Sequence, residues 1–302
     1  KKLILSASLD ILALLKSVSI ARDGSKSTSK SWRTSAECLE NCLFRLDLWY
    51  DQSPCVRIYH ALNTLAAEPR LPIERIIVDG CLSVGQVRHF NRFNPCSVSD
   101  SRLNSLCVKN GLSNTHRQAL FTCVKHRLSV VQGPPGSGKT ALASALLEAF
   151  CKERNLICGP SDAAVDYLTL RFVSSDLFNS FGAYNLVRLV SDKVWKEGKV
   201  DPNLEDYFFV NWVNRLTGIG NYNSKKQAEW WNSGGFNEVN TLSSTLALCG
   251  SSIMDAPGRF MDNIIMDEAA QATEPESIIP LSSLSASPDA GRFILIGDLM
   301  QL

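Results

Sequence analysis

Short runs of consecutive apolar residues recur in the C-terminal two thirds of the chain. Three of them have the length and composition of buried strands: Leu128–Gln132, Asn263–Met266 and 293–296. The first is followed by a glycine-rich stretch and then by residues 141–150, which are strong helix formers. The pattern therefore predicts a strand, a loop and a helix in succession, with two further strands towards the C-terminal end.

The N-terminal third shows a different pattern. Residues 3–20 are apolar enough for a signal peptide or a membrane span. Asp10 and Lys16 interrupt them, however, and polar residues fall on one helical face, which favours an amphipathic packing helix over residues 1–22. Residues 23–35 are rich in serine and lysine, as in a flexible linker. We expect residues 36–111 to form a smaller N-terminal module of structural or regulatory type.

Charge and composition exclude only broad classes of protein. The 302 residues include 31 basic and 30 acidic side chains, a net charge of +1, so a nucleic-acid or membrane partner has to be argued from local features. A hydrophobic fraction of 45% excludes wholesale disorder. The 10 cysteines include no C-x-x-C pair, which favours reduced thiols over a disulfide framework. We therefore expect an intracellular protein, cytoplasmic or nuclear, with no membrane partner.

Residues 133–140 read GPPGSGKT and match the phosphate-binding pattern G-x-x-x-x-G-K-[ST] between a strand and a helix. Glycines let backbone N–H groups curl around a phosphate, and the helix N-terminus adds a favourable dipole. Lys139 is expected to reach the β- and γ-phosphates of ATP, and the Thr140 hydroxyl to bind Mg²⁺. The ATP-binding candidates in this loop are Gly133, Pro134, Pro135, Gly136, Ser137, Gly138, Lys139 and Thr140.

Two carboxylates follow the predicted strand Asn263–Met266. A carboxylate at the C-terminal end of a strand beside the phosphate-loop strand can hold Mg²⁺, so we expect these two strands to be neighbours and Asp267 to be a metal ligand. Glu268 is placed to orient or deprotonate the attacking water. Together with Lys139, the pair predicts an ATP-hydrolysing site.

The strand at 293–296 is followed by Gly297-Asp298 and, three residues later, by Gln301. A polar amide at this strand end, beside the γ-phosphate, can sense whether that phosphate is present. The catalytic candidates are therefore Lys139, Glu268 and Gln301.

Four strings, in this order, resemble motifs of superfamily 1 helicases, most of all the Upf-like group that includes the nonsense-mediated-decay helicase and senataxin. They are QGPPGSGKT at 132–140, GPSDAAVD at 159–166, DEAAQATEPE at 267–276, and Gly297-Asp298 with Gln301-Leu302. Generic phosphate-loop ATPases lack the QATEPE extension. The resemblance covers about residues 112–302. It implies a P-loop, RecA-like α/β domain with a parallel sheet flanked by helices, and a helical insertion at about residues 170–240.

The resemblance also implies contacts with ligands. Residues of the second string would touch the backbone of single-stranded RNA or DNA, and Gln301 would contact the γ-phosphate of ATP. The implied nucleic-acid contacts are Pro160, Ser161, Asp162 and Val165.

This chain departs from the family pattern at three places. His116 stands where the family has a glutamine that recognises adenine, with Gln118 two residues later. Asp162 stands where the family has an asparagine, and places a carboxylate where a phosphate should approach. The family also tends to have a threonine after the hydrophobic strand that precedes the Asp-Glu strand, and residues 248–251 of this chain read LCGS there.

The predicted insertion is unusually aromatic. Residues 191–236 contain nine aromatic, six basic and six acidic residues. Aromatic side chains can stack on bases, but a segment without net charge offers no electrostatic groove for a nucleic acid. We therefore expect these aromatics to pack inside a helical arm.

The resemblance implies the ATP-binding first motor domain of a superfamily 1 helicase. In the complete parent protein such a domain couples ATP hydrolysis to movement along single-stranded RNA or DNA, with ATP and Mg²⁺ as cofactors. The chain stops after Gln301, so we expect the second RecA-like domain to be absent and the chain alone to bind ATP but turn it over slowly. Two alternatives stay open: a nucleotide-switched scaffold, and a P-loop ATPase that remodels proteins.

Overall fold

The computed structural model describes residues 53–66, 73, 77, 98–175, 186–199, 201–218, 229, 231–251, 253–254, 261–283 and 291–301. All of them belong to one compact unit, Asp51–Leu302. The helix expected over residues 1–22 and the linker expected over 23–35 lie outside the described residues.

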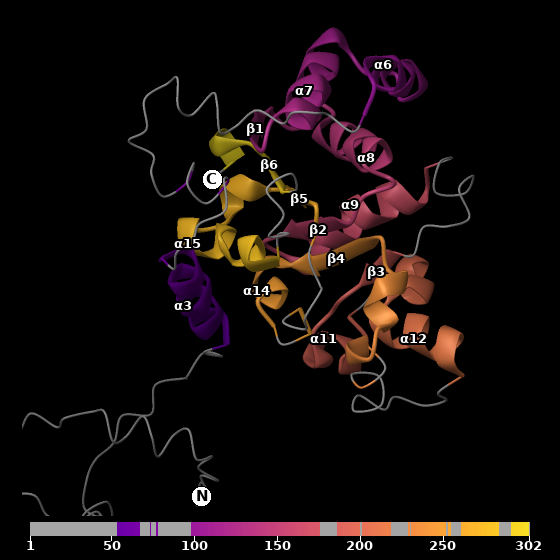
Figure 1. Cartoon of the computed structure of the whole chain (residues 1–302), viewed down its shortest axis with the longest axis vertical. Helices are drawn as coiled ribbons and strands as arrows, with labels where there is room; N and C mark the ends of the chain where they lie inside the picture. The colour runs from indigo at the N-terminus through magenta and orange to yellow at the C-terminus, as the bar shows by residue number, and fades with distance from the viewer. Residues whose placement is uncertain are drawn as a thin grey trace, which may run out of the picture. The chain divides into compact units, whose positions relative to one another are not determined.

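A six-stranded sheet, parallel throughout, forms the centre of this unit (Figure 1). Its central strands are buried along their whole length, as expected for a parallel sheet covered on both faces. The α/β fold class is therefore confirmed. In sheet order the strands are β1 (Leu128–Gln132), β6 (Arg292–Gly297), β5 (Asn263–Met266), β2 (Asn155–Gly159), β4 (Thr241–Thr245) and β3 (Leu186–Arg188).

The order of the strands corrects one expectation. β5, which ends before Asp267, is not the neighbour of β1, because β6 lies between them and pairs with both. The last strand in the chain thus enters the sheet beside the first. Sequence order carries no information about this insertion, because pairing between distant strands is decided by tertiary packing.

The two faces of the sheet are packed by different helices. Side chains alternate across a strand, so Ile264 and Met266 join one buried cluster while Ile265 joins the other. The first cluster includes side chains from α3 (Ser53–Ala66), α12 (Phe209–Thr217) and α14 (Leu246–Cys249). The second includes side chains from α6 (Asp100–Lys109), α7 (Asn114–Lys125), α8 (Lys139–Ala149) and α9 (Asp162–Val173).

Helix α8 is the most deeply buried of these. Every residue from 142 to 149 is buried, including Glu148, because the segment is apolar on all sides and lies against the sheet. The Glu148 carboxylate accepts a hydrogen bond from Asn110 Nδ2 at 3.0 Å, and its backbone carbonyl accepts one from Arg102 Nη2 at 2.9 Å. These contacts fasten α6 to the helix that follows the phosphate loop.

Helices α3 and α6 both come from residues 36–111, which the sequence assigns to a separate module. Leu103 of α6 is fully buried in the cluster that contains α8. Arg57 of α3 donates a hydrogen bond to the Ala247 carbonyl at 2.8 Å. The division at residue 111 stays a prediction about domains, but these two helices pack directly on the sheet domain.

The chain after β4 differs from the expectation. β4 ends at Thr245, and residues 246–249 form the short helix α14, so residues 248–251 do not follow the strand directly. A threonine is therefore present at the strand end. Gly250, one of the departures noted in the sequence, lies where a Cβ would come within 2.8 Å of Ile279 Cγ2 and 3.0 Å of Arg57 Cβ. The glycine lets α3 approach the sheet domain.

The segment between β3 and β4 forms short helices: α11 (Asp192–Lys196), η2 (Pro202–Tyr207), α12 and η3 (Gly235–Glu238). Trp212 and Trp231 are each 1% exposed, and their rings meet edge to face at a centroid distance of 6.4 Å. Trp231 also contacts Phe209 and Phe236 edge to face, a favourable arrangement for aromatic pairs. The expectation that these aromatics form packing contacts is confirmed for this group; Tyr222 and Trp230 lie outside the described residues.

Within the described residues, no helix has the length and hydrophobicity of a membrane span.

Trp231→Ala is expected to lower the free energy of unfolding by about 3–5 kcal/mol, because it leaves a cavity among three aromatic rings and removes the hydrogen bond from Nε1 to the Ile253 carbonyl at 3.0 Å. Urea unfolding followed by tryptophan fluorescence and circular dichroism measures the change. Trp195→Ala is the matched control, since Trp195 is only partly buried and contacts Phe208 at 5.9 Å. Equal losses for the two variants would contradict the packing argument.

Candidate functional site

The predicted phosphate loop connects β1 to α8 and requires glycine for steric reasons. Gly138 has φ +88° and caps the N-terminus of α8, and a Cβ on it would lie 2.9 Å from His116 Cε1. A Cβ on Gly133 would lie 2.5 Å from Ser137 Oγ. The backbone conformation of Gly138 disfavours any side chain, whereas a side chain at Gly133 would require the Ser137 hydroxyl to move. The loop keeps the tight curvature that exposes backbone N–H groups to an anion.

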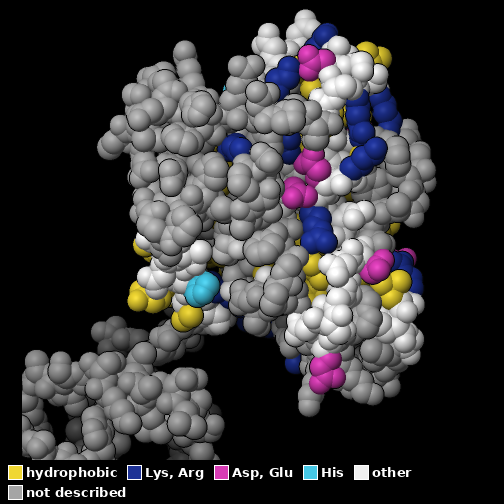
Figure 2. Space-filling model, viewed as in Figure 1, with side chains coloured by type: hydrophobic (Ala, Val, Ile, Leu, Met, Phe, Trp, Pro, Cys, Tyr) yellow, Lys and Arg dark blue, Asp and Glu magenta, His cyan; other side chains and the backbone are white. Residues whose placement is uncertain are grey.

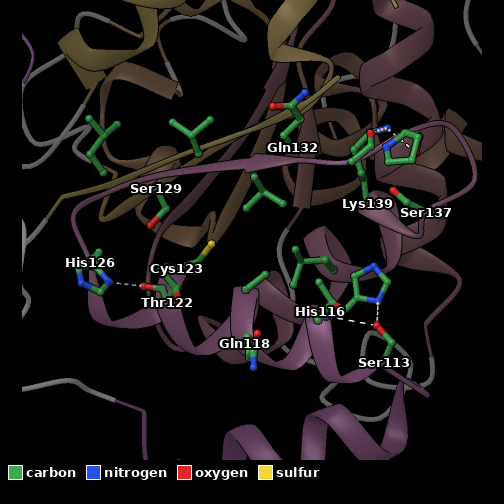
Figure 3. Close-up of a pocket in the computed structure, with 18 residues that line it drawn as sticks. Ser113, His116, Gln118, Thr122, Cys123, His126, Ser129, Gln132, Ser137 and Lys139 are labelled. Carbon is green, nitrogen blue, oxygen red and sulfur yellow. Dashed lines mark hydrogen bonds between the residues drawn. The ribbon is translucent and has the colours of Figure 1, made fainter. Parts of the chain in front are cut away.

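Lys139 and Thr140 occupy the first turn of α8 and are partly buried. The Lys139 ammonium donates hydrogen bonds to the carbonyls of Gly133 at 2.7 Å and Pro134 at 3.3 Å, so its side chain folds back over the loop (Figure 3). Pro134, Pro135 and Gly136 are exposed at the loop tip. A lysine held over a helix N-terminus makes this surface attractive to anions.

Asp267 follows β5 directly and is only 5% exposed. Its backbone N–H donates to the Cys158 carbonyl at 2.9 Å, and its Oδ1 accepts the Glu268 N–H at 2.9 Å. Burial raises the pKa of Asp267 to about 6; the hydrogen bond from Glu268 and the positive charge of Lys139 lower it only in part. The site therefore contains a carboxylate that lacks full compensation for its burial.

Glu268 is held in a sparsely populated backbone conformation. Its φ of +51° is the only positive value for a non-glycine residue within the described ranges. Gln271 Nε2 donates a hydrogen bond to Glu268 Oε2 at 3.1 Å, which orients the carboxylate. Such strain persists only where the surrounding structure imposes it, and it is frequent at functional sites.

Gly297, at the end of β6, joins the phosphate loop to the Asp267–Glu268 turn. Its carbonyl accepts the Gly133 N–H at 3.2 Å, and a Cβ on it would lie 2.9 Å from the Ala270 backbone nitrogen. Asp298 is 4% exposed, and its Oδ1 accepts the Met300 N–H at 3.1 Å. Gln301 ends the 3₁₀ turn η6 (Leu299–Gln301), and its side chain lies outside what the structure describes.

The predicted ATP-handling residues thus come together along one edge of the sheet. The phosphate loop, the Asp267–Glu268 turn and Gly297-Asp298 follow the C-terminal ends of β1, β5 and β6. Ligands of open parallel sheets bind outside this edge. A buried carboxylate, an oriented carboxylate and a lysine over a glycine loop suit a phosphate group with a hard cation.

A cavity of about 750 Å³ lies beside the phosphate loop, between α7 and the outer edge of β1 (Figure 3). His116 and Gln118, the two candidates for base recognition, both line it, together with Lys139. His116 Nδ1 lies 2.8 Å from Ser113 Oγ, and the imidazole covers Gly138. The Gln118 side chain is exposed.

The predicted nucleic-acid contacts lie at the end of β2 and the start of α9. Ser161 caps α9 by accepting the Ala164 N–H at 3.2 Å, and both Pro160 and Asp162 are partly exposed. Val165 is 1% exposed, so its side chain is not available to a strand; it packs against Gly159. This part of the prediction needs correction, because α9 turns Val165 towards the sheet.

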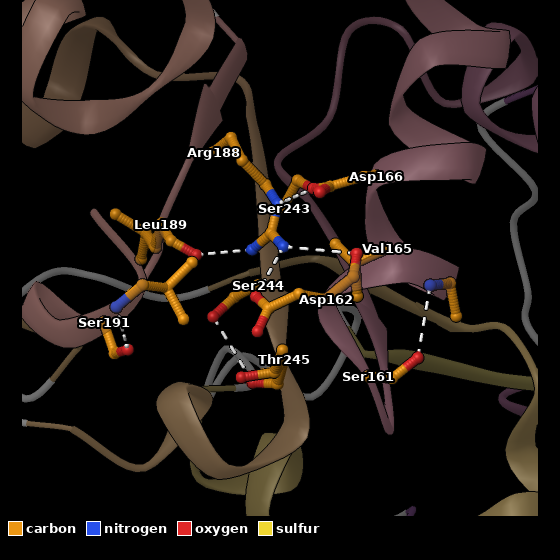
Figure 4. Close-up of polar contacts among 12 residues, drawn as sticks. Ser161, Asp162, Val165, Asp166, Arg188, Leu189, Ser191, Ser243, Ser244 and Thr245 are labelled. Atoms are coloured by element: carbon orange, nitrogen blue, oxygen red, sulfur yellow. Dashed lines mark hydrogen bonds and ion pairs between the residues drawn. The ribbon is translucent and has the colours of Figure 1, made fainter. Parts of the chain in front are cut away.

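The Asp162 carboxylate is paired with a buried arginine at this edge. The fully buried Arg188, at the end of β3, donates from Nη2 to Asp162 Oδ1 at 2.8 Å and from Nε to Asp166 Oδ1 at 2.7 Å (Figure 4). Burial raises the pKa of Asp166, and the Arg188 charge opposes that rise. The carboxylate expected to face a phosphate is thus part of an ion-pair cluster with one positive and two negative groups.

The sequence alone does not reveal the surroundings of three residues near this edge. Arg188 is an ordinary basic residue in an apolar strand, and only the structure pairs it with α9. Gln271 lies within the DEAAQATEPE string that resembles the helicase motif. The string does not show that Gln271 contacts Glu268. Ser129, in the cavity beside α7, belongs to a strand whose pattern indicates packing alone.

Asp267→Asn is expected to stabilise the protein in the absence of metal. A carboxyl pKa of about 6 in the folded state, against 3.8 without the fold, means that folding disfavours the charged form. Asp267 therefore lowers the free energy of unfolding above pH 6, and the loss diminishes as the pH falls towards 4. At pH 8 the variant should gain up to about 3 kcal/mol, and about half of that at pH 5.

Urea unfolding in EDTA at the two pH values measures this, with the exposed Asp206→Asn as control. A loss of stability for Asp267→Asn at pH 8 would contradict the assignment of an uncompensated carboxylate.

Comparison with known proteins agrees with the architecture of the site. The family model for the AAA domain matches residues 111–218 and 219–302. The chain is 27% identical over 207 residues to the ATP-dependent helicase NAM7 of Saccharomyces cerevisiae, covering 63% of this chain and 20% of that protein. It is 28% identical over 221 residues to the RNA helicase Mov10l1 of Homo sapiens, covering 72% and 15% respectively.

The chain therefore spans a fifth or less of the length of these two relatives. Among solved structures, the UvsW helicase from bacteriophage T4 is similar with a TM-score of 0.44 and 14% identity, over 70% of this chain and 64% of that one. Since the family model matches well over half of its residues, the chain belongs to the AAA domain family. The helicase relatives agree with the expected resemblance to Upf-like superfamily 1 helicases.

Proposed function

We propose that this chain is the ATP-binding first motor domain of a helicase that couples ATP hydrolysis to translocation on single-stranded nucleic acid in the complete protein. The observation that carries the proposal is the contact of Gly297 with both the phosphate loop and the turn after Asp267–Glu268. Through it, the groups that would bind phosphate and those that would cleave it share one rigid edge.

The phosphate loop would hold the triphosphate. Its backbone N–H groups and the N-terminus of α8 would bind the phosphate oxygens, and Lys139 would exchange its hydrogen bonds with Gly133 and Pro134 for the β- and γ-phosphates. The Lys139 ammonium therefore lies over the loop, close to where a phosphate would bind.

The Thr140 hydroxyl and the Asp267 carboxylate fit Mg²⁺. Both offer oxygen, which Mg²⁺ prefers, and the incompletely compensated charge of Asp267 favours a cation beside it. When bound, the ion would neutralise charge that develops on the phosphates. Glu268, oriented by Gln271, would position or deprotonate the attacking water, and Gln301 would report on the γ-phosphate.

Nucleic acid would pass over the start of α9, at Pro160 and Ser161. The exposed position of these residues supports nucleic-acid binding, but the charge around them does not. On the face shown in Figure 2, the described basic side chains are interspersed with acidic ones, and the cluster of Arg188, Asp162 and Asp166 carries a net negative charge. That charge favours the second candidate function, a nucleotide-switched scaffold that binds partners without moving along a strand.

Lys139→Ala and Glu268→Gln separate binding from hydrolysis. Lys139→Ala is expected to weaken Mg-ATP binding by at least about tenfold, because the phosphates lose a charged contact. Glu268→Gln should keep the affinity but reduce hydrolysis by roughly 10²-fold or more. Calorimetry on this chain gives the affinities, and phosphate release by the complete parent protein with the same substitutions gives the rates with and without single-stranded RNA and DNA.

The exposed Lys152→Ala is the control and should behave as the unmodified chain. Unchanged binding by Lys139→Ala would refute the ATP site. Binding and hydrolysis that no strand stimulates would favour the scaffold.

Asp162→Asn is expected to raise affinity for a single-stranded oligonucleotide. The amide oxygen can still accept from Arg188, while one negative charge is removed where a phosphate would approach. The gain should be about fivefold at low salt, since a unit charge at ~4 Å in water contributes ~1 kcal/mol, and it should shrink at high salt. Fluorescence anisotropy at two salt concentrations measures it.

Asp100→Asn on α6, which likewise removes one carboxylate charge beside a basic partner, Lys125, serves as the control. Unchanged or weaker binding by Asp162→Asn would show that phosphates do not approach the start of α9.

A further inference from the structure

The His116 ring lies against the backbone that would bind the phosphates. A Cβ on Gly138, the N-cap residue of α8, would lie 2.9 Å from His116 Cε1 and 3.1 Å from Nε2. The ring is partly buried, between Ser113 and the loop that carries Ser137 and Lys139 (Figure 3). A charge on this ring would therefore lie close to an anion held at the start of α8.

The surroundings of the ring suit an anion. His116 is in the first turn of α7 and contacts the N-cap of α8, so it lies at the positive ends of two helix dipoles. Neither helix has an acidic residue in its first turn, and Lys139 lines the same cavity. A bound triphosphate would bring several negative charges into this environment, and nearby negative charge favours the protonated form of an imidazole.

The other titratable groups around the ring do not duplicate this role. Among the described residues that line the cavity there is no carboxylate, and the titratable side chains besides His116 are Cys123, His126 and Lys139. Burial raises the pKa of Cys123 to about 11, so its thiol stays neutral. Strand β1 has no titratable side chain. The charged groups of α6 have partners elsewhere: Asp100 pairs with Lys125, Lys109 with Glu148, and Arg102 donates to the Glu148 carbonyl.

Histidine is the side chain that readily changes its charge near neutral pH. The imidazolium carries a proton on both ring nitrogens, so the charged ring is the same whichever nitrogen is protonated in the neutral form. Ser113 Oγ, 2.8 Å from Nδ1, can accept from the charged ring as well as from the His116 backbone N–H. The contacts of the ring are therefore compatible with a positive charge.

We infer that His116 takes up a proton when a nucleoside triphosphate binds, and that its imidazolium provides a second positive charge beside Lys139. The inference rests on the proposed function, because it requires that a nucleotide binds the phosphate loop. Linkage makes the effect reciprocal: the factor by which the triphosphate favours protonation is the factor by which protonation strengthens binding. Affinity therefore rises as the pH falls through the range in which histidine titrates.

Titration with Mg-ATP at pH 6 and pH 8.5 tests the inference, with the unmodified chain compared with His116→Gln at each pH. The ratio of their affinities should favour the unmodified chain about fivefold more at pH 6, the effect of one unit charge on another at about 4 Å in water. The ratio cancels the titration of Asp267 and of the nucleotide, which both proteins share. Calorimetry at pH 7.5 in two buffers of different ionisation enthalpy should show greater proton uptake by the unmodified chain.

Two further variants separate charge from packing. His116→Lys carries its charge at both pH values, so it should lose this pH dependence and bind at pH 8.5 more tightly than His116→Gln. A role of the ring in packing alone would not produce that result. The exposed His60→Gln on α3 is the matched control and should behave as the unmodified chain.

Failure of the inference differs from failure of the proposed function. If the unmodified chain does not bind Mg-ATP at either pH, the ATP site is refuted and the inference with it. If it binds, but His116→Gln shows the same pH dependence and the same proton uptake, the inference is overturned while the ATP site stands. A dependence that survives in His116→Gln and disappears in His126→Gln would assign the proton to His126 and would also overturn the inference.

Discussion

The candidate site depends on the close approach of backbone groups at Gly297. The Gly297 carbonyl accepts the first N–H of the phosphate loop, and its missing side chain leaves room for the backbone nitrogens of Ala269 and Ala270. β6 separates β1 from β5, so the phosphate loop and the two carboxylates have no direct strand pairing. Gly297 contacts both the loop and the turn, so it links their positions. A side chain there would push the carboxylate turn away from the loop.

Two buried charged groups near this edge, Arg188 and Asp267, differ in how far their charges are compensated. Arg188 is fully buried, and its donors reach Asp162, Asp166 and the Leu189 carbonyl, so the charge is paired and the cluster ties β3 to α9. Asp267 is almost as buried, but burial dominates its surroundings and raises its pKa to about 6. The first arrangement stabilises a fold. The second leaves a carboxylate whose burial is only partly compensated.

Local sequence patterns predicted the features that neighbouring residues determine. They did not predict the features that depend on packing between distant segments. The phosphate loop, Asp267 and Glu268 could be located because glycines at fixed spacing and carboxylates at a strand end are local signals. The position of β6 between β1 and β5, the end of β4 at Thr245 and the burial of Val165 could not, because each is decided by packing between distant segments. Arg188 is the clearest case: 22 residues separate it from Asp166, and no spacing rule connects them.

At both departures from the family pattern, residues 116 and 162, a neighbouring serine and not the changed residue caps the helix. Ser113 accepts the His116 N–H at the start of α7, and Ser161 accepts the Ala164 N–H at the start of α9. The capping of α7 and α9 therefore does not depend on the side chains at 116 and 162, which contact Ser113 and Arg188 instead. Glycine is required more strictly in the loop after β1 and at the end of β6, since Gly138 has φ +88° and a Cβ on Gly297 would lie 2.9 Å from the Ala270 backbone nitrogen. The local structure thus restricts the glycines of the loop and of the β6 end more than it restricts the side chains at the starts of α7 and α9.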